Sequence, residues 1–136
     1  MAHPSADFTS RLLVDAGIRP GMRVLDVGCG LGDVTFLAAA LVGEAGRVVG
    51  VDRNEGALGA ARNRATPAGS AVPTFVHADL GALPGDLGMF DAVIGRRVLM
   101  YLPDVLAAVR ALTQHLVPGG VMAFQELDMS LSLIHI

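Results

Sequence analysis

The chain has 136 residues, of which 52% are apolar and 17% are charged, and its formal net charge is -3. This balance is typical of one globular domain; it excludes a disordered chain and offers no positive surface for nucleic acid. The longest apolar run, residues 34–42, is about half as long as a bilayer requires, and the first residues lack the pattern of a secretory signal. We therefore expect a cytoplasmic domain with no membrane span and no nucleic-acid partner.

Two helices are predicted around the first strand. The first helix begins at Ser5 or Asp7, either of which can cap it, and stops at Gly17. The strand, residues 22–27, is apolar enough to be covered on both faces, as strands of parallel sheets are. The second helix covers residues 34–42, because its apolar side chains recur at spacings of three and four. These side chains are Val34, Leu37, Ala38, Leu41 and Val42.

Strands and helices alternate through the rest of the chain. A helix over residues 54–65 has Asn54 as its cap, and its Arg62 and Arg64 are interpreted as a solvated face. A later helix is opened by Leu102-Pro103-Asp104 and carries Val105, Val109, Leu112 and Leu116 on one face, before the turn Pro118-Gly119-Gly120. Further strands are predicted over residues 46–52, 74–77, 90–95 and 121–124. This alternation predicts an α/β fold with a doubly wound, mostly parallel sheet and helices on both faces.

A glycine turn follows the first strand, in the stretch Val24-Leu25-Asp26-Val27-Gly28-Cys29-Gly30-Leu31-Gly32-Asp33. Three glycines at alternate positions let the backbone bend sharply and come close to a ligand. Cys29 is the only cysteine, which excludes an internal disulfide and fits a reducing compartment. We interpret it as a small buried residue rather than as a reactive nucleophile.

Polar residues follow the other predicted strands. Asp52 ends the second strand, Asp79 the third, and Arg96 with Arg97 the fourth. Ligands of such sheets bind outside the carboxyl ends of the strands, and a carboxylate after the second strand can accept from two ribose hydroxyls. These residues therefore predict a pocket for a nucleoside-type ligand.

The charge of the turn bears on which nucleoside is bound. A dinucleotide fingerprint needs glycine at its first, third and sixth positions, and the sixth is Asp33 here. Asp26 and Asp33 would oppose a diphosphate, whereas they would suit S-adenosylmethionine, which carries a sulfonium and an ammonium. The turn thus favours S-adenosylmethionine, and an NAD-dependent oxidoreductase stays the less favoured alternative.

Five motifs together resemble class I S-adenosylmethionine-dependent methyltransferases, in particular the small-molecule branch that includes ubiquinone and menaquinone biosynthesis methyltransferases. The resemblance covers residues 8 to about 128. It implies a Rossmann-like sheet with strand order 3-2-1-4-5 and S-adenosylmethionine as cofactor. The motifs are Val24 to Gly32, Val49 to Asp52, His77 to Leu80, Phe90 to Val93 and Leu116 to Gly120.

The resemblance also implies a role for each residue of the pocket. Along the methionine part of the cofactor it places Gly28, Cys29 and Gly30, with Asp26 nearby and Arg96 by the methionine end, and Gly32 is counted as cofactor-binding with the other glycines of the turn. Around the adenosine it places Asp52 on the ribose hydroxyls, Arg53 beside the adenine, Asp79 on the exocyclic amine and Leu80 on a ring nitrogen. No metal site is predicted.

The substrate side of the site is less defined. Methyl transfer from a sulfonium needs positioning and exclusion of water more than a dedicated nucleophile. A general base could assist, and the candidates are His3, His77, His115 and His135. None of them is convincing, so we assign no catalytic residue. The sequence Gly95-Arg96-Arg97-Val98 departs from the Asn/Asp-Pro-Pro-Tyr/Phe tetrad of amino-group methyltransferases, which favours a carbon or oxygen of a small molecule as methyl acceptor.

The end of the chain carries a separate expectation. The family's sheet has seven strands, and this chain has five predicted strands before a tail of different composition. We expect a methyltransferase domain over residues 1–129 that lacks the last two strands, followed by a non-native tail over residues 130–136. The fifth strand would then lack its outer neighbour, and a fragment that binds S-adenosylmethionine without turnover is an alternative to an active enzyme.

Overall fold

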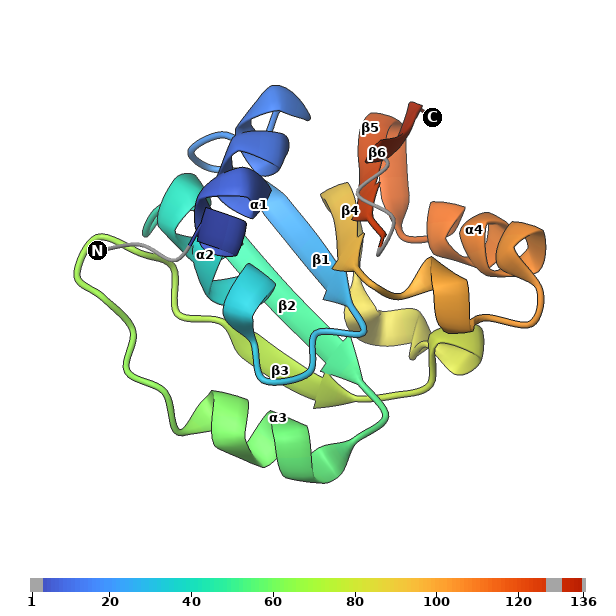
Figure 1. The fold of residues 1–136 in the computed structure, drawn as a ribbon, viewed down its shortest axis with the longest axis horizontal. Coiled ribbons are helices and arrows are strands. Elements are labelled where there is room, and N and C mark those ends of the chain that lie inside the picture. Colours follow the sequence, from blue (N-terminus) through green and yellow to red (C-terminus); the bar gives the residue numbers. More distant parts are fainter. Residues whose placement is uncertain (1–3, 127–130, 136) are drawn as a thin grey trace.

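The computed structural model describes the backbone of residues 4–126 and 131–135, built around one sheet (Figure 1). The sheet has the order β3-β2-β1-β4-β5-β6, and its first five strands in this order run parallel, which confirms the expected 3-2-1-4-5 arrangement. The strands are β1 (Arg23–Val27), β2 (Arg47–Asp52), β3 (Thr74–His77), β4 (Phe90–Arg96), β5 (Leu116–Gln125) and β6 (Leu131–His135).

The edge of the sheet differs from the expectation. β6 pairs antiparallel with β5, with Met122 opposite Ile134, so β5 does have an outer neighbour. Residues 131–135, Leu-Ser-Leu-Ile-His, alternate between apolar and polar only as far as Leu133, so the local pattern alone does not predict this strand. The boundary placed between residues 129 and 130 lies outside the described residues.

Four α-helices connect the strands, α1 (Pro4–Asp15), α2 (Asp33–Val42), α3 (Glu55–Arg62) and α4 (Val105–Thr113). Because α1 already begins at Pro4, Ser5 and Asp7 lie in its first turn and the predicted cap was wrong. The Asn54 cap is confirmed, since its Oδ1 accepts a hydrogen bond from the Ala57 amide at 3.1 Å. Leu116, expected on α4, belongs to β5, whose register with β4 shifts across the Pro118-Gly119-Gly120 segment.

Buried side chains form layers on both faces of the sheet, as predicted. On one face, Val24 and Val48 pack with Ala38 and Val42 of α2 and with Leu13 of α1. The other face is covered by Leu112 of α4 and by short 3-10 turns, and its sheet side chains include Leu25, Val49, Phe90 and Phe124. The 3-10 turns are Leu80–Ala82, Gly85–Leu87 and Leu99–Tyr101.

The described helices are all short. None of them is long and apolar enough to cross a membrane.

Candidate functional site

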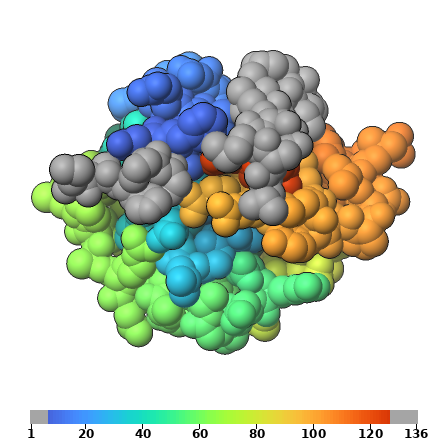
Figure 2. Space-filling model, viewed as in Figure 1, coloured from blue at the N-terminus to red at the C-terminus, as the bar shows by residue number. Residues whose placement is uncertain are grey.

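Two adjoining hollows lie at the carboxyl ends of β1 to β4, where the sequence placed a pocket. The larger has a volume of about 460 Å³ and the smaller about 210 Å³, and both are lined by Gly28 and Arg97. In the space-filling view, the cyan loop before α2 lies beside the amber residues that follow β4 (Figure 2). We call the larger the adenosine hollow and the smaller the methionine hollow, after the ligand parts that the sequence predicted there.

The loop from Gly28 to Gly32 has a backbone that favours glycine at each alternate position. The φ angles of Gly28, Gly30 and Gly32 are 65°, 54° and 90°, in the left-handed region that L side chains rarely adopt. A Cβ on Gly28 would lie 2.6 Å from Cγ2 of Val98, whereas a Cβ on Gly30 would meet nothing within 4 Å. Gly28 therefore lets the loop approach the segment after β4, and Gly30 leaves space open to a ligand.

Asp52 ties this loop to the end of β2. Its Oδ2 accepts the Gly30 amide at 2.8 Å, and its Oδ1 accepts the Asn54 amide at 2.8 Å. The Cys29 amide donates to the Val51 carbonyl at 3.0 Å, which adds a backbone link between the same two elements. A carboxylate has about four acceptor positions, so Asp52 can hold the loop and still accept from a ligand.

Asp26 lies beneath the methionine hollow and is almost fully buried, with 1% of the residue exposed. The Thr35 hydroxyl donates to its Oδ2 at 2.6 Å. Burial raises the pKa of the Asp26 carboxyl to about 7; the Thr35 hydrogen bond and the Arg96 charge oppose this rise, and the Asp52 charge adds to it. Asp26 is thus only partly ionised at neutral pH, and it offers less negative charge than the sequence argument assumed.

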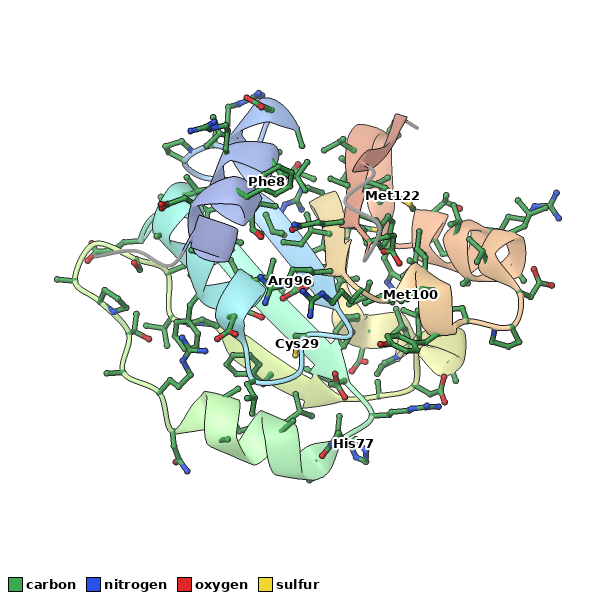
Figure 3. All side chains as sticks on the ribbon, in the orientation of Figure 1. Phe8, Cys29, His77, Arg96, Met100 and Met122 are labelled. Carbon is green, nitrogen blue, oxygen red and sulfur yellow. The ribbon has the colours of Figure 1, made fainter. Side chains whose placement is uncertain are left out.

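Asp33 is also less available than the sequence argument assumed. Its Oδ1 lies 2.8 Å from Nη1 of Arg64, and its Oδ2 lies 3.7 Å from Nη2 of Arg96. Arg96, at the end of β4, and Cys29, in the glycine loop, both line the methionine hollow (Figure 3). The hollow therefore combines carboxylates with guanidinium groups, and such a mixture suits a zwitterionic amino acid better than a purely cationic ligand.

Cys29 is buried, as predicted. Burial raises the pKa of its thiol to about 12, and the charges of Asp26 and Asp52 add to the rise. Because the thiolate is the nucleophilic form, the thiol is inert at neutral pH. A catalytic role for Cys29 is therefore not supported.

The adenosine hollow is lined by the ends of β2 and β3. Asp52, Arg53, Asp79 and Leu80 all contribute to it. Asp79 is exposed, and its Oδ1 accepts the Gly81 amide at 2.9 Å, which fixes the carboxylate at the start of the 3-10 turn. The acidic side chains that the sequence assigned to an adenosine thus face one space.

The structure brings together every predicted site residue except Gly32 in the lining of one hollow or the other. Gly32 precedes α2, where a Cβ would lie 3.2 Å from Phe75 and 3.3 Å from Ala61, so it serves close packing instead. Arg97, which the sequence placed at the end of the fourth strand, also lines the adenosine hollow. The prediction missed the rest of this wall, which follows β4 and consists of Val98, Tyr101, Leu102 and Pro103. The apolar run after Arg97, which has no helical or strand period, was the available signal.

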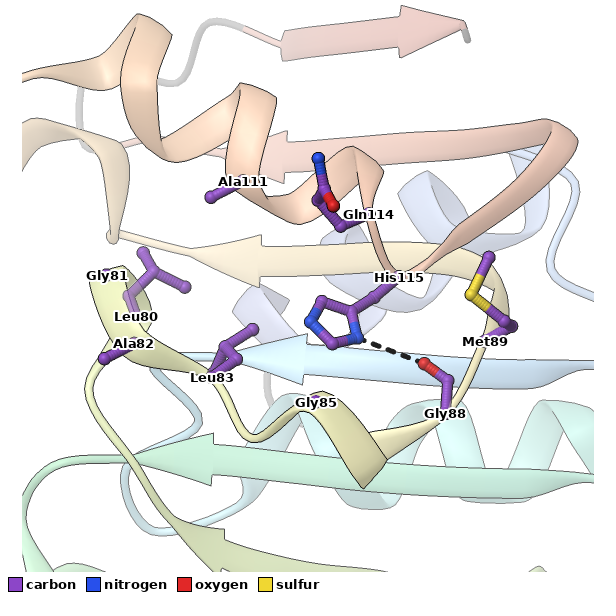
Figure 4. Close-up of a pocket in the computed structure, with 10 residues that line it drawn as sticks. All are labelled: Leu80, Gly81, Ala82, Leu83, Gly85, Gly88, Met89, Ala111, Gln114 and His115. Atoms are coloured by element: carbon purple, nitrogen blue, oxygen red, sulfur yellow. Dashed lines mark hydrogen bonds between the residues drawn. The ribbon is translucent and has the colours of Figure 1, made fainter.

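Of the four histidines considered as general bases, His77 and His115 lie outside both hollows, and the side chains of His3 and His135 lie outside the described residues. His77 Nε2 is 2.9 Å from the Arg53 carbonyl, and His77 lies at the outer edge of the sheet (Figure 3). His115 Nδ1 is 3.1 Å from the Gly88 carbonyl, so this nitrogen donates the proton. His115 lines a separate cavity of about 440 Å³ between α4 and the 3-10 turns, whose lining includes neither the glycine loop nor a carboxylate (Figure 4). Neither histidine is therefore placed to act on a ligand of the two hollows.

A profile described as methyltransferase domain matches residues 18–135, which is most of the chain. The chain belongs to the S-adenosylmethionine-dependent methyltransferases. Demethylmenaquinone methyltransferase of Staphylococcus aureus (strain MRSA252) is 34% identical to it over 119 residues, which cover 88% of this chain and 48% of the relative. This methyltransferase chain thus spans about half the length of the curated relatives that it matches.

Solved structures agree with this membership. An S-adenosylmethionine dependent methyltransferase from Mesorhizobium loti is 31% identical, with a TM-score of 0.71, and the match covers 89% of this chain and 53% of that chain. TrmN from Thermus thermophilus is also 31% identical, with a TM-score of 0.77, and the match covers 90% of this chain and 38% of that chain. The fold and the family expected from the five sequence motifs are confirmed.

Proposed function

We propose that this methyltransferase chain binds S-adenosylmethionine across the two hollows and transfers its methyl group to a carbon or oxygen of a small molecule. The observation that carries the proposal is that Asp52 holds the glycine loop through the Gly30 amide, so that the adenosine hollow and the methionine hollow, each lined by two aspartates and two arginines, meet at Gly28. A cytoplasmic location is part of the same proposal.

The residues present fit this cofactor. A Cβ on Gly30 would meet nothing within 4 Å, so the loop leaves bare backbone open to a ligand there, and at Gly28 the absence of a Cβ lets the loop lie against Val98. The carboxylates of Asp52 and Asp79 offer acceptors, and the groups that an adenosine presents there are hydroxyl and amino donors. A diphosphate would instead place negative charge against the same carboxylates.

In the adenosine hollow, Asp52 would accept from the ribose hydroxyls and Asp79 from the exocyclic amine. Arg53 and Leu80 would flank the adenine, because both line the same hollow. In the methionine hollow, Arg96 would pair with the carboxylate of the cofactor, while the Gly28 to Gly30 backbone lies against its chain. Asp26 would support the loop from below through Thr35.

When bound, the cofactor supplies an electrophilic methyl group on a sulfonium. The residues of this chain contribute by holding the ligand in place and excluding water on its protein side. Among the described residues that line the two hollows there is no histidine, so proton removal from an acceptor is not assigned to a side chain.

A small-molecule acceptor is supported by the name of the Staphylococcus aureus relative, a demethylmenaquinone methyltransferase. The segment Gly95-Arg96-Arg97-Val98 supports carbon or oxygen methylation, because it departs from the tetrad of amino-group methyltransferases. Binding without turnover is the alternative, since the chain spans about half of its relatives and part of an acceptor pocket can lie in the other half.

Methyl transfer from S-adenosylmethionine labelled in its methyl group, measured against a panel of quinols, phenols and other small metabolites, tests the proposal. Label in an extracted small-molecule product supports methyl transfer. Saturable cofactor binding with no labelled product from any acceptor supports the alternative of binding without turnover.

A further inference from the structure

Arg64 lies two residues beyond the end of α3, and sequence reasoning assigned it to a solvated face. In the structure it reaches back over the glycine loop, where its Nη1 donates to the Leu31 carbonyl at 3.0 Å and pairs with Asp33 Oδ1 at 2.8 Å. Its guanidinium also stacks on the Phe36 ring, 4.5 Å from the ring centroid. One side chain thus contacts the loop and the first turn of α2 in three ways.

These contacts continue to the methionine hollow through Asp33. The second carboxylate oxygen of Asp33 faces Nη2 of Arg96 at 3.7 Å, and Arg96 lines that hollow. The two ion pairs Arg64–Asp33 and Asp33–Arg96 therefore link the segment after α3 to the start of α2 and to the end of β4, across the loop. Arg64 lines neither hollow itself, so any influence that it has on a bound ligand passes through the loop and Asp33.

We propose that Arg64 is a positioning residue for the cofactor, which holds the Leu31 to Asp33 segment so that Asp33 keeps Arg96 directed at the methionine hollow. The inference rests on the proposed function. Asp33 divides its charge between two arginines, and without Arg64 it would be free to follow Arg96 or to turn to solvent. The chain offers this segment no comparably placed side-chain tie among the contacts of the described residues.

Arg62, the last residue of α3, is a matched control two positions before Arg64. Its side chain is as exposed as that of Arg64, 41% in both cases. It pairs with Glu55 Oε1 at 2.6 Å and donates to the Phe75 carbonyl at 3.0 Å, both away from the glycine loop. Loss of either arginine removes one exposed ion pair and one hydrogen bond to a carbonyl. Arg64 loses its contact with Phe36 in addition, whereas the hydrogen bond of Arg62 is the more buried of the two, so the effects on overall stability should be comparable.

Titration calorimetry with S-adenosylmethionine and with S-adenosylhomocysteine tests the inference on wild type, Arg64→Gln, Arg64→Lys and Arg62→Gln. We expect Arg64→Gln to lower the affinity for both ligands by the same factor, roughly three- to tenfold, because both carry the same amino-acid carboxylate. The affinity of Arg64→Lys should lie between those of wild type and Arg64→Gln. Lysine keeps the charge but lacks the planar guanidinium that donates to two acceptors and stacks on an aromatic ring. Arg62→Gln should bind as wild type does, with a melting temperature lowered by an amount comparable to that in Arg64→Gln.

A double-mutant cycle measures the coupling between Arg64 and Asp33 in cofactor affinity, which a purely structural role of Arg64 would not produce. If Arg64 acts through Asp33, the pair Asp33→Asn with Arg64→Gln should bind no more weakly than Asp33→Asn alone. The penalty of Arg64→Gln should also shrink as the salt concentration rises.

Each contrary outcome overturns the inference. Wild-type affinity in Arg64→Gln, an equal loss in Arg62→Gln, a loss for S-adenosylmethionine only, or additive losses in the cycle would each contradict it. Failure of the wild type to bind either ligand would instead remove the proposed function itself, and the two failures are therefore distinguishable.

Discussion

Replacing Gly28 by alanine probes the closest approach in the proposed cofactor site. Two costs combine at this position. The φ of 65° forces alanine into the left-handed region, at about 1–2 kcal/mol. Its Cβ would lie 2.6 Å from Val98 Cγ2, and relief of such overpacking costs about 1–3 kcal/mol more.

Gly30→Ala is the matched control, because alanine there also has to adopt the left-handed backbone conformation but its Cβ makes no close contact. Its φ is 54°, and an added Cβ meets nothing within 4 Å. We therefore expect Gly28→Ala to be less stable than Gly30→Ala by about 1–3 kcal/mol. Because the chain has no tryptophan, urea unfolding is best followed by far-ultraviolet circular dichroism.

Val98→Ala in the Gly28→Ala background identifies the source of the difference. If the contact is responsible, the double variant recovers part of the stability that Gly28→Ala loses, beyond the sum of the single effects. Equal losses in Gly28→Ala and Gly30→Ala, or strict additivity with Val98→Ala, would refute the steric argument.

Three further predictions concern the charged and reactive groups of the site. Because burial raises the pKa of Asp26 from about 4 to about 7, folding takes up a proton between these values, so wild-type stability should fall as pH rises through this window. In Asp26→Asn this part of the pH dependence of the free energy of unfolding should disappear. A variant whose free energy of unfolding, measured in urea, changes with pH as in wild type would contradict the raised pKa of Asp26. Cys29, with a pKa raised to about 12, should react with iodoacetamide much more slowly in the folded chain than in urea, and rapid labelling of the native protein would be inconsistent with its burial. Asp52→Asn replaces one acceptor oxygen by a donor, so it should weaken S-adenosylhomocysteine binding by about tenfold or more in calorimetry, and undiminished affinity would exclude Asp52 from the site.

The sheet and most of the cofactor site follow from local patterns. Short apolar strands that alternate with helices predicted a doubly wound parallel sheet, and the resemblance to the methyltransferase motifs implied the order of β1 to β5. An acidic residue after each of β2 and β3 predicted the adenosine hollow. These features are readable because a parallel sheet brings all its carboxyl ends to one edge.

The features that the sequence did not predict depend on contacts between distant segments. Arg64 has the composition and spacing of an exposed helical residue, and only the packing of α3 beside the loop brings it to Leu31 and Asp33. The depressed ionisation of Asp26 likewise needs its burial, which one sequence position does not reveal. Val98 was missed for the same reason, since its partner Gly28 lies 70 positions earlier in the sequence.

Binding of S-adenosylmethionine rather than NAD at this site is best tested by measuring the affinity of the chain for both cofactors. Titration calorimetry of the purified chain should give saturable, one-to-one binding of S-adenosylmethionine, no heat of binding with NAD, and a clear loss of S-adenosylmethionine affinity in Asp52→Asn. Binding of NAD in the absence of any affinity for S-adenosylmethionine would contradict the proposed site.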